Sequence, residues 1–181
     1  NYEVVMSLDK HLIPERTCSE CSVCCISLRI EEPELTKKAD VPCPHLSSVK
    51  GCAIYNSRPG VCRNWYCGWR IMPFVNEEMR PDKSKVLIKT DGHNFIFQPL
   101  TAQDVSSLLN INVMEAMATL VLNDVSVQTS IPTRSGFTNA LSEVNDLLKP
   151  SLKTMNLREG RQAMKTLIFH ARHAQTLPEK D

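Results

Sequence analysis

The sequence lacks three features that would point to common classes of protein. It contains no run near the roughly 18 consecutive apolar residues that a membrane-spanning helix needs, so we expect no membrane span. Lys and Arg total 21 against 20 Asp and Glu, and this balance gives no positive excess for nucleic acid or an anionic membrane. A Gly-rich phosphate loop, a nucleophile elbow and a His-Glu-x-x-His motif are also absent. The usual markers of phosphoryl transfer, serine hydrolysis and zinc-protease chemistry are therefore missing.

One segment has the outline of a DNA-binding element. Residues 100–122 resemble a helix-turn-helix with its turn at residues 110–112. The second helix would have to enter a phosphate-lined groove, yet residues 114–120 contain no Lys or Arg and include Glu115. We therefore expect this segment to pack inside the protein, and we expect no nucleic-acid partner.

Cysteine is confined to one part of the chain. All eight cysteines lie between Cys18 and Cys67. Proline and glycine interrupt residues 1–80 too often for long helices or strands, so this part should consist of loops and short helices. A segment with so little regular hydrogen bonding needs another source of order, and metal ligation by the cysteines is the simplest one.

Length and composition favour a single domain. A chain of 181 residues with 42% apolar residues is long enough to bury one sizeable core. We predict one soluble, cytoplasmic domain over residues 1–181. Within it, residues 15–70 form a metal-binding lobe, and residues 71–181 form a scaffold that ends in helices.

The scaffold has alternating strand and helix patterns. Val86–Thr90 and residues 93–98 favour two strands, joined at Asp91-Gly92, a pair that accepts the positive φ angles of a tight turn. The other predicted elements are helices at 101–109 and 112–122, a strand at 125–131, a helix at 137–149 ending at Pro150, and a helix starting at Asn156. The predicted fold class is α+β, with a loop-rich, metal-tied N-terminal lobe packed on a β-hairpin and about four helices.

The cysteine spacing indicates metal ligation. Four thiols fall within eight residues, and two intervening residues let consecutive thiolates converge on one ion or cluster. Because Cys24 and Cys25 are adjacent, we infer that they serve different ligation points or different metals. The eight candidate ligands are Cys18, Cys21, Cys24, Cys25, Cys43, Cys52, Cys62 and Cys67. Eight thiolates suit two four-coordinate sites or one larger cluster, and thiolates favour zinc, cuprous copper and iron–sulfur centres.

Disulfides are the alternative use of an even number of cysteines. A chain with a long cysteine-free part can build its core without them, and a Cys-Cys doublet is awkward for well-shaped bridges. Between metals, the distant Cys43-Pro44 step is typical of ferredoxins and favours iron–sulfur, whereas scattered cysteine pairs and His45 as an extra ligand favour zinc. We expect an iron–sulfur cluster or zinc, in that order.

These motifs resemble the C-x-x-C-x-x-C-C cysteine-cluster family, YkgJ-type zinc- or iron-chelating proteins that include flagellin lysine N-methylases. The resemblance covers roughly residues 15–70 and rests on the motif at 18–25, on Cys43-Pro44-His45-Leu46, and on residues 51–67 with their Arg58-Pro59 and Cys62-Arg63 steps. It implies a metal-chelating domain with all eight cysteines as ligands, and no single activity.

Arg58 and Arg63 recur in the pattern of this family. A nearby guanidinium offsets the negative charge of clustered thiolates or binds an anionic group, so we predict such a role for both. The predicted function is metal binding through the eight cysteines, with redox or modification chemistry and an unspecified protein or small-molecule partner. The alternatives are a structural zinc module for protein–protein interaction and a lysine N-methylase-like enzyme with a small-molecule methyl donor.

Overall fold

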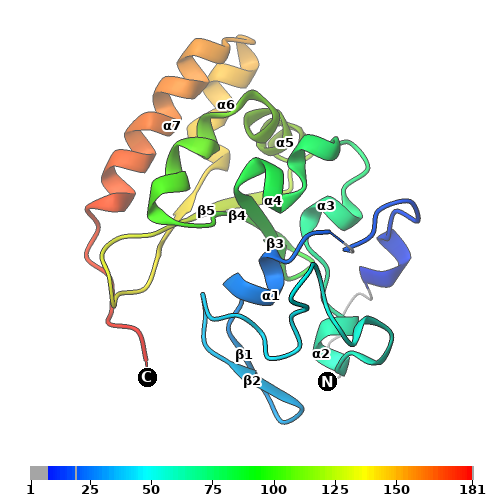
Figure 1. Cartoon of the computed structure of the whole chain (residues 1–181). Coiled ribbons are helices and arrows are strands. Elements are labelled where there is room, and N and C mark those ends of the chain that lie inside the picture. The colour runs from blue at the N-terminus through cyan, green and yellow to red at the C-terminus, as the bar shows by residue number, and fades with distance from the viewer. Residues whose placement is uncertain (1–7, 19, 181) are drawn as a thin grey trace, which may run out of the picture.

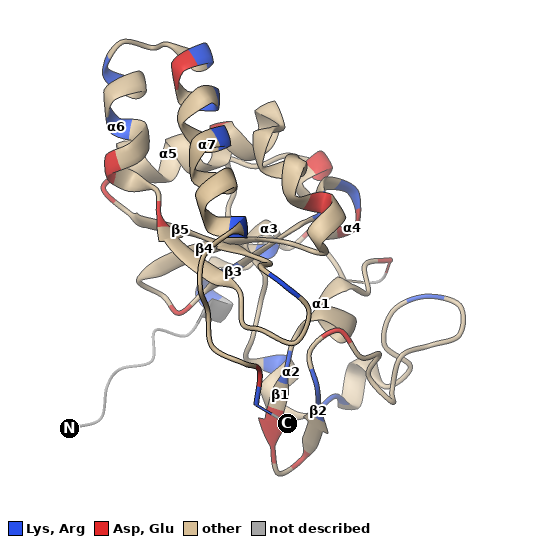
Figure 2. Ribbon diagram, turned by 90° about the vertical axis from the view of Figure 1, so that its left-hand side faces the viewer, with Lys and Arg blue, Asp and Glu red and all other residues tan. Residues whose placement is uncertain are grey.

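A mixed four-stranded sheet forms the middle of the molecule, which we describe from a computed structural model covering residues 8–18 and 20–180. Helices α5, α6 and α7 lie on one side of the sheet, and the short elements α1, β1, β2 and α2 lie on the other (Figures 1 and 2). Helices and strands together confirm the predicted α+β class. The middle sheet is larger than the predicted hairpin because two further strands join it.

Residues 8–85 contain only short elements, as predicted. The helical ones are η1 (Leu8–His11), α1 (Val23–Ser27), η2 (Tyr55–Ser57), α2 (Gly60–Arg63), α3 (Gly68–Ile71), η3 (Glu77–Met79) and α4 (Pro81–Ser84). The sequence patterns did not indicate the two-stranded antiparallel sheet formed by β1 (Ile30–Glu32) and β2 (Leu35–Lys37).

The larger elements follow in the second half of the chain. They are β3 (Val86–Thr90), β4 (Asn94–Pro99), η4 (Ala102–Leu109), α5 (Ile111–Leu122), β5 (Ser126–Ile131), β6 (Ala140–Glu143), α6 (Asn145–Lys153) and α7 (Leu157–Arg172). The sheet order is β3-β4-β5-β6, and only β4 and β5 run parallel, joined by a crossover through η4 and α5.

Two local signals, the Asp91-Gly92 turn and the Asn156 cap, were predicted correctly. Gly92 has a φ of +94° in the turn between β3 and β4, as the Asp91-Gly92 pair predicts. Asn156 caps α7 by accepting a hydrogen bond from the backbone N–H of Glu159, at 3.1 Å. Helix α5 also begins at a capping asparagine, but this is Asn110 rather than the predicted Asn112.

The predicted helix at 137–149 is wrong. Residues 140–143 form β6, which pairs with β5 so that Ala140 faces Ile131. Helix α6 begins only at Asn145 and contains Pro150, which was expected to end a helix. Pairing with a strand that ends nine residues earlier outweighs the local helical pattern here, because the ladder satisfies backbone groups at the edge of the sheet.

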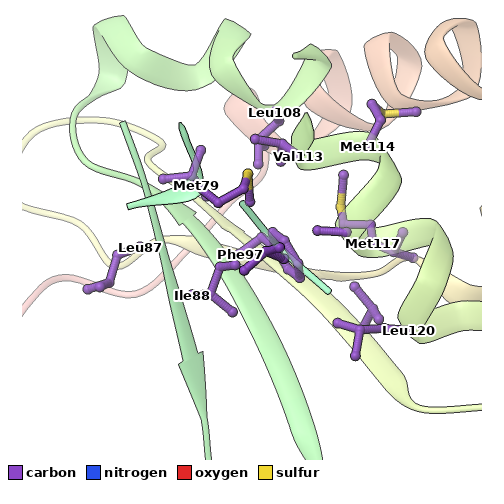
Figure 3. Close-up of a cluster of buried hydrophobic side chains, with 14 of the residues drawn as sticks. Met79, Leu87, Ile88, Phe97, Leu108, Val113, Met114, Met117 and Leu120 are labelled. Carbon is purple, nitrogen blue, oxygen red and sulfur yellow. The ribbon is translucent and has the colours of Figure 1, made fainter. Parts of the chain in front are cut away.

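The main core lies between the sheet and the helices. Ile88 and Phe97 face each other across β3 and β4 and are 1% and 0% exposed. Met117 and Leu120 of α5 point toward them, and Leu108 of η4 lies above Phe97 (Figure 3). The 114–120 segment is thus part of the core, as its lack of basic residues predicted.

No single helix in the described ranges is long and apolar enough to cross a membrane, and η4 and α5 reach that length and composition only as a pair bent by 66°. Basic and acidic segments are interspersed on α6 and α7 (Figure 2).

Candidate metal centre

The cysteines come together because short backbone contacts fold the N-terminal lobe onto itself. The N–H of Cys43 donates to the carbonyl of Cys25 at 2.9 Å, and the N–H of Leu46 donates to the carbonyl of Cys43 at 2.9 Å. Leu46 in turn forms an isolated antiparallel bridge with Cys52. These contacts carry the segment after Cys43 back beside α1.

The other ligand candidates are carried by the helices around this segment. Cys24 and Cys25 lie in α1, and Cys62 lies in α2. Cys67 immediately precedes α3 and acts as its N-cap residue. All eight cysteines are free thiols, so the disulfide alternative finds no bridge in the structure.

One cavity of about 210 Å³ contacts all eight cysteines. Its remaining wall is mostly apolar and aromatic, and it includes Ile30, Leu35, Ile54, Val61, Trp65 and Tyr66. His45 also lines the cavity, as does Arg58. The residues predicted as ligands therefore surround a single space, although they come from segments up to 49 residues apart in sequence.

The thiols surround this space instead of meeting at a point. Zinc–sulfur bonds of about 2.3 Å would place four tetrahedral sulfur atoms about 3.8 Å from one another. Within the described part of the chain, no group of three or more His, Cys, Asp or Glu side chains is placed to hold one metal ion. In a cubane cluster of four irons, each thiolate binds a different iron atom, so the thiolates stand farther apart than they do around one zinc ion.

Positive side chains lie close to the thiols. The Arg70 guanidinium donates to the sulfur of Cys18 at 3.1 Å and lies 5.4 Å from the Tyr66 ring. The Arg58 guanidinium lies 3.9 Å from the centroid of the Tyr55 ring. Arg63 is exposed and lies outside the cavity wall formed by the described residues. Arg70 takes the position expected of Arg63, and no sequence signal distinguished it beyond its closeness to Cys67.

Two buried donors on the cavity wall have no acceptor among the described residues. They are Nε of Arg58 and Nε of Arg70. A buried N–H without a partner is unfavourable by about 1–3 kcal/mol. An electron-rich group bound between the cysteines would supply acceptors, so both the donors and the eight thiols fit a sulfide-containing cluster or thiolate-bound metal.

Burial and charge give the thiols different acidities. The pKa of Cys25 is lowered to about 7, first because the Cys24 thiol hydrogen-bonds to it and then because Lys37 and Arg58 are positive. Burial raises the pKa of Cys67 to about 12 and also raises the pKa of Cys21. Because metals bind the thiolate, metal binding at the buried thiols must displace protons.

The chain matches no family model, no curated protein and no solved structure. The resemblance to the cysteine-cluster family therefore rests on the motif residues between positions 15 and 70.

Proposed function

We propose that this protein binds metal through its eight cysteines, and that the metal is held as iron–sulfur in preference to zinc. The observation that carries the proposal is the single cavity lined by all eight thiols. The C-x-x-C-x-x-C-C motif and its resemblance to zinc- or iron-chelating proteins support the same conclusion.

Iron–sulfur is preferred because of how the thiols and their neighbours are arranged. The thiols are spread around a cavity of about 210 Å³, which suits a polynuclear centre better than one ion. Arg70, which donates to Cys18, and Arg58 place positive charge where a thiolate cluster concentrates negative charge. When bound, such a cluster supplies one-electron transfer or redox sensing, and its potential depends on these donors and on burial.

A closed structural zinc module is the second candidate. It would be favoured by metal without sulfide, because structural zinc is held by four protein ligands and leaves no open position. The lysine N-methylase-like alternative needs a polar or acidic groove beside the metal. The charged residues in its mostly apolar wall are Arg29, Arg58 and Arg70, and their positive charge suits an anionic ligand better than a lysine ammonium group.

The test is metal and acid-labile sulfide content, with a visible spectrum, on protein purified without oxygen. We expect iron, a matching amount of sulfide and a brown absorbance. Zinc near two per chain without sulfide would favour the structural module. Protein that holds neither metal, and whose thiols are oxidised to disulfides, would contradict the proposal.

A further inference from the structure

Four of the cysteines form an inner group against the sheet. Cys18, Cys21, Cys24 and Cys67 also line a second, much smaller cavity of about 10 Å³, whose other walls are Trp69, Pro81 and Leu87. Cys21 and Cys67 are each 9% exposed, and Leu87 of β3 is fully buried. This group therefore lies at the boundary between the lobe and the scaffold.

The other four cysteines form an outer group. Cys43 is hydrogen-bonded through its backbone to Cys25, and Cys52 is held beside this segment by its bridge to Leu46. Cys62 lies in α2 and lines the large cavity together with Cys25, Cys43 and Cys52. All four are partly exposed, and none of them lines the small inner cavity.

The adjacent pair at positions 24 and 25 separates the two groups. Both residues lie in α1, where successive side chains point about 100° apart around the helix axis. Cys24 lines the inner cavity with Cys67, whereas Cys25 lines the large cavity and not the inner one. The doublet allows one short helix to contribute a ligand to each side.

We infer that the eight cysteines form two separate four-thiolate centres, an inner one held by Cys18, Cys21, Cys24 and Cys67, and an outer one held by Cys25, Cys43, Cys52 and Cys62. The inference rests on the proposed function, since it assigns ligands within the same site. Four thiolates are the full ligand set of one cubane cluster, in which each thiolate binds its own iron atom, and this suits thiols of the described residues that are not placed around a single ion.

The adjacent cysteines provide a matched pair of variants for the test. Cys24→Ser and Cys25→Ser are prepared beside the unaltered chain, each reconstituted without oxygen with ferrous iron and sulfide, and separately with zinc alone. Each variant should bind half the metal of the unaltered chain. Their visible spectra should differ from each other and add up to the spectrum of the unaltered chain.

Double variants then distinguish two centres from one shared centre. Cys52→Ser combined with Cys62→Ser removes two outer ligands and should lose no more metal than either single variant. Cys62→Ser combined with Cys67→Ser removes a ligand from each group and should lose nearly all the metal. Equal metal loss in the two double variants would overturn the partition.

Folding and metal binding are checked separately. If an inner variant fails to fold by circular dichroism, the outer variants still decide the question, because Cys25→Ser, Cys43→Ser, Cys52→Ser and Cys62→Ser should all retain the same half of the metal. Different residual metal or spectra among these four would refute the assignment. An unaltered chain that binds no metal would instead refute the proposed function.

Discussion

At the scale of single residues, a few charged side chains order loops and turns by satisfying several backbone groups at once. The Lys37 ammonium donates to three backbone carbonyl oxygens, and the Arg16 guanidinium donates to three others. Asp91 does the converse, because its carboxylate accepts hydrogen bonds from the backbone N–H groups of His93 and Asn94 at 2.8 and 2.7 Å. Such side chains pair with backbone groups that would otherwise be hydrogen-bonded within longer helices or strands.

Asp91→Ala should destabilise the chain in a pH-dependent way. Hydrogen bonds from Asn94 and His93 lower the pKa of Asp91 to about 2. A carboxyl group whose pKa is lower in the folded than in the unfolded chain stabilises the fold at pH values above its unfolded pKa of about 4. This stabilisation is lost as the pH falls toward 2. Because Asp91 is exposed to solvent, we expect a loss of only about 1 kcal/mol at pH 7.

Urea unfolding at pH 7 and at pH 3 measures this difference. Asp91→Asn is the matched control, because its side-chain oxygen still accepts from the backbone but does not titrate. The difference in free energy of unfolding between the unaltered chain and Asp91→Ala should be smaller at pH 3 than at pH 7. The difference between Asp91→Asn and Asp91→Ala should stay nearly constant. A gap between the unaltered chain and Asp91→Ala that is the same at both pH values would contradict the assigned role of the carboxylate.

At the scale of elements, the cysteine-bearing segment is joined to the sheet where α3 packs against β3. Gly68, the residue after Cys67, opens α3 and lies against Ile88. A Cβ atom on Gly68 would lie 2.5 Å from Cγ2 and 2.7 Å from Cβ of Ile88, closer than real atoms approach. The absence of a side chain at position 68 therefore sets the distance between the inner cysteines and the core.

Gly68→Ala should destabilise the chain by about 2–3 kcal/mol, because one of the two elements must shift. Gly60→Ala is the matched control, since a Cβ there meets nothing closer than 3.7 Å and α2 accepts alanine. Urea unfolding of both variants gives the comparison, and metal content shows whether the inner thiols move. Equal stability of the two variants would show that close packing at Gly68 does not join the cysteine-bearing segment to the sheet.

At the scale of the whole molecule, two halves of different character are combined. The lobe has short elements (Figure 1), and its eight thiols line one cavity. The scaffold has the sheet and the large apolar core (Figures 1 and 3). The end of the chain returns to the lobe, where the guanidinium of Arg29 donates to the carbonyl of Lys180 at 3.1 Å. Under the proposed function, we expect bound metal to order the lobe, whereas hydrophobic burial orders the scaffold.

Removal of the metal with a strong chelator should loosen the lobe and leave the scaffold folded. Hydrogen exchange followed by mass spectrometry should show amides in residues 15–70 exchanging roughly 100-fold faster. Amides of β4 and α5 serve as the internal control and should keep their protection. Loss of protection throughout the chain would show that the two halves unfold together, and unchanged exchange in the lobe would show that metal does not order it.

The sequence by itself determined the features that depend on neighbours along the chain. Asp91-Gly92 specified the turn between β3 and β4, and Asn156 specified the start of α7. The cysteine spacing at 18–25 identified candidate metal ligands. Turn geometry and capping use backbone groups within a few residues, so local sequence is sufficient to predict them.

Only the tertiary structure decided the features that depend on distant segments. Ala140 is in a strand because Ile131 is available to pair with it, and Arg70 rather than Arg63 reaches the thiols because α3 packs on β3. That Cys24 lines the inner cavity with Cys67 while Cys25 does not likewise depends on where the segment carrying Cys67 comes to lie. Long-range pairing and burial involve residues far apart in sequence, and no local pattern specifies which of them will meet.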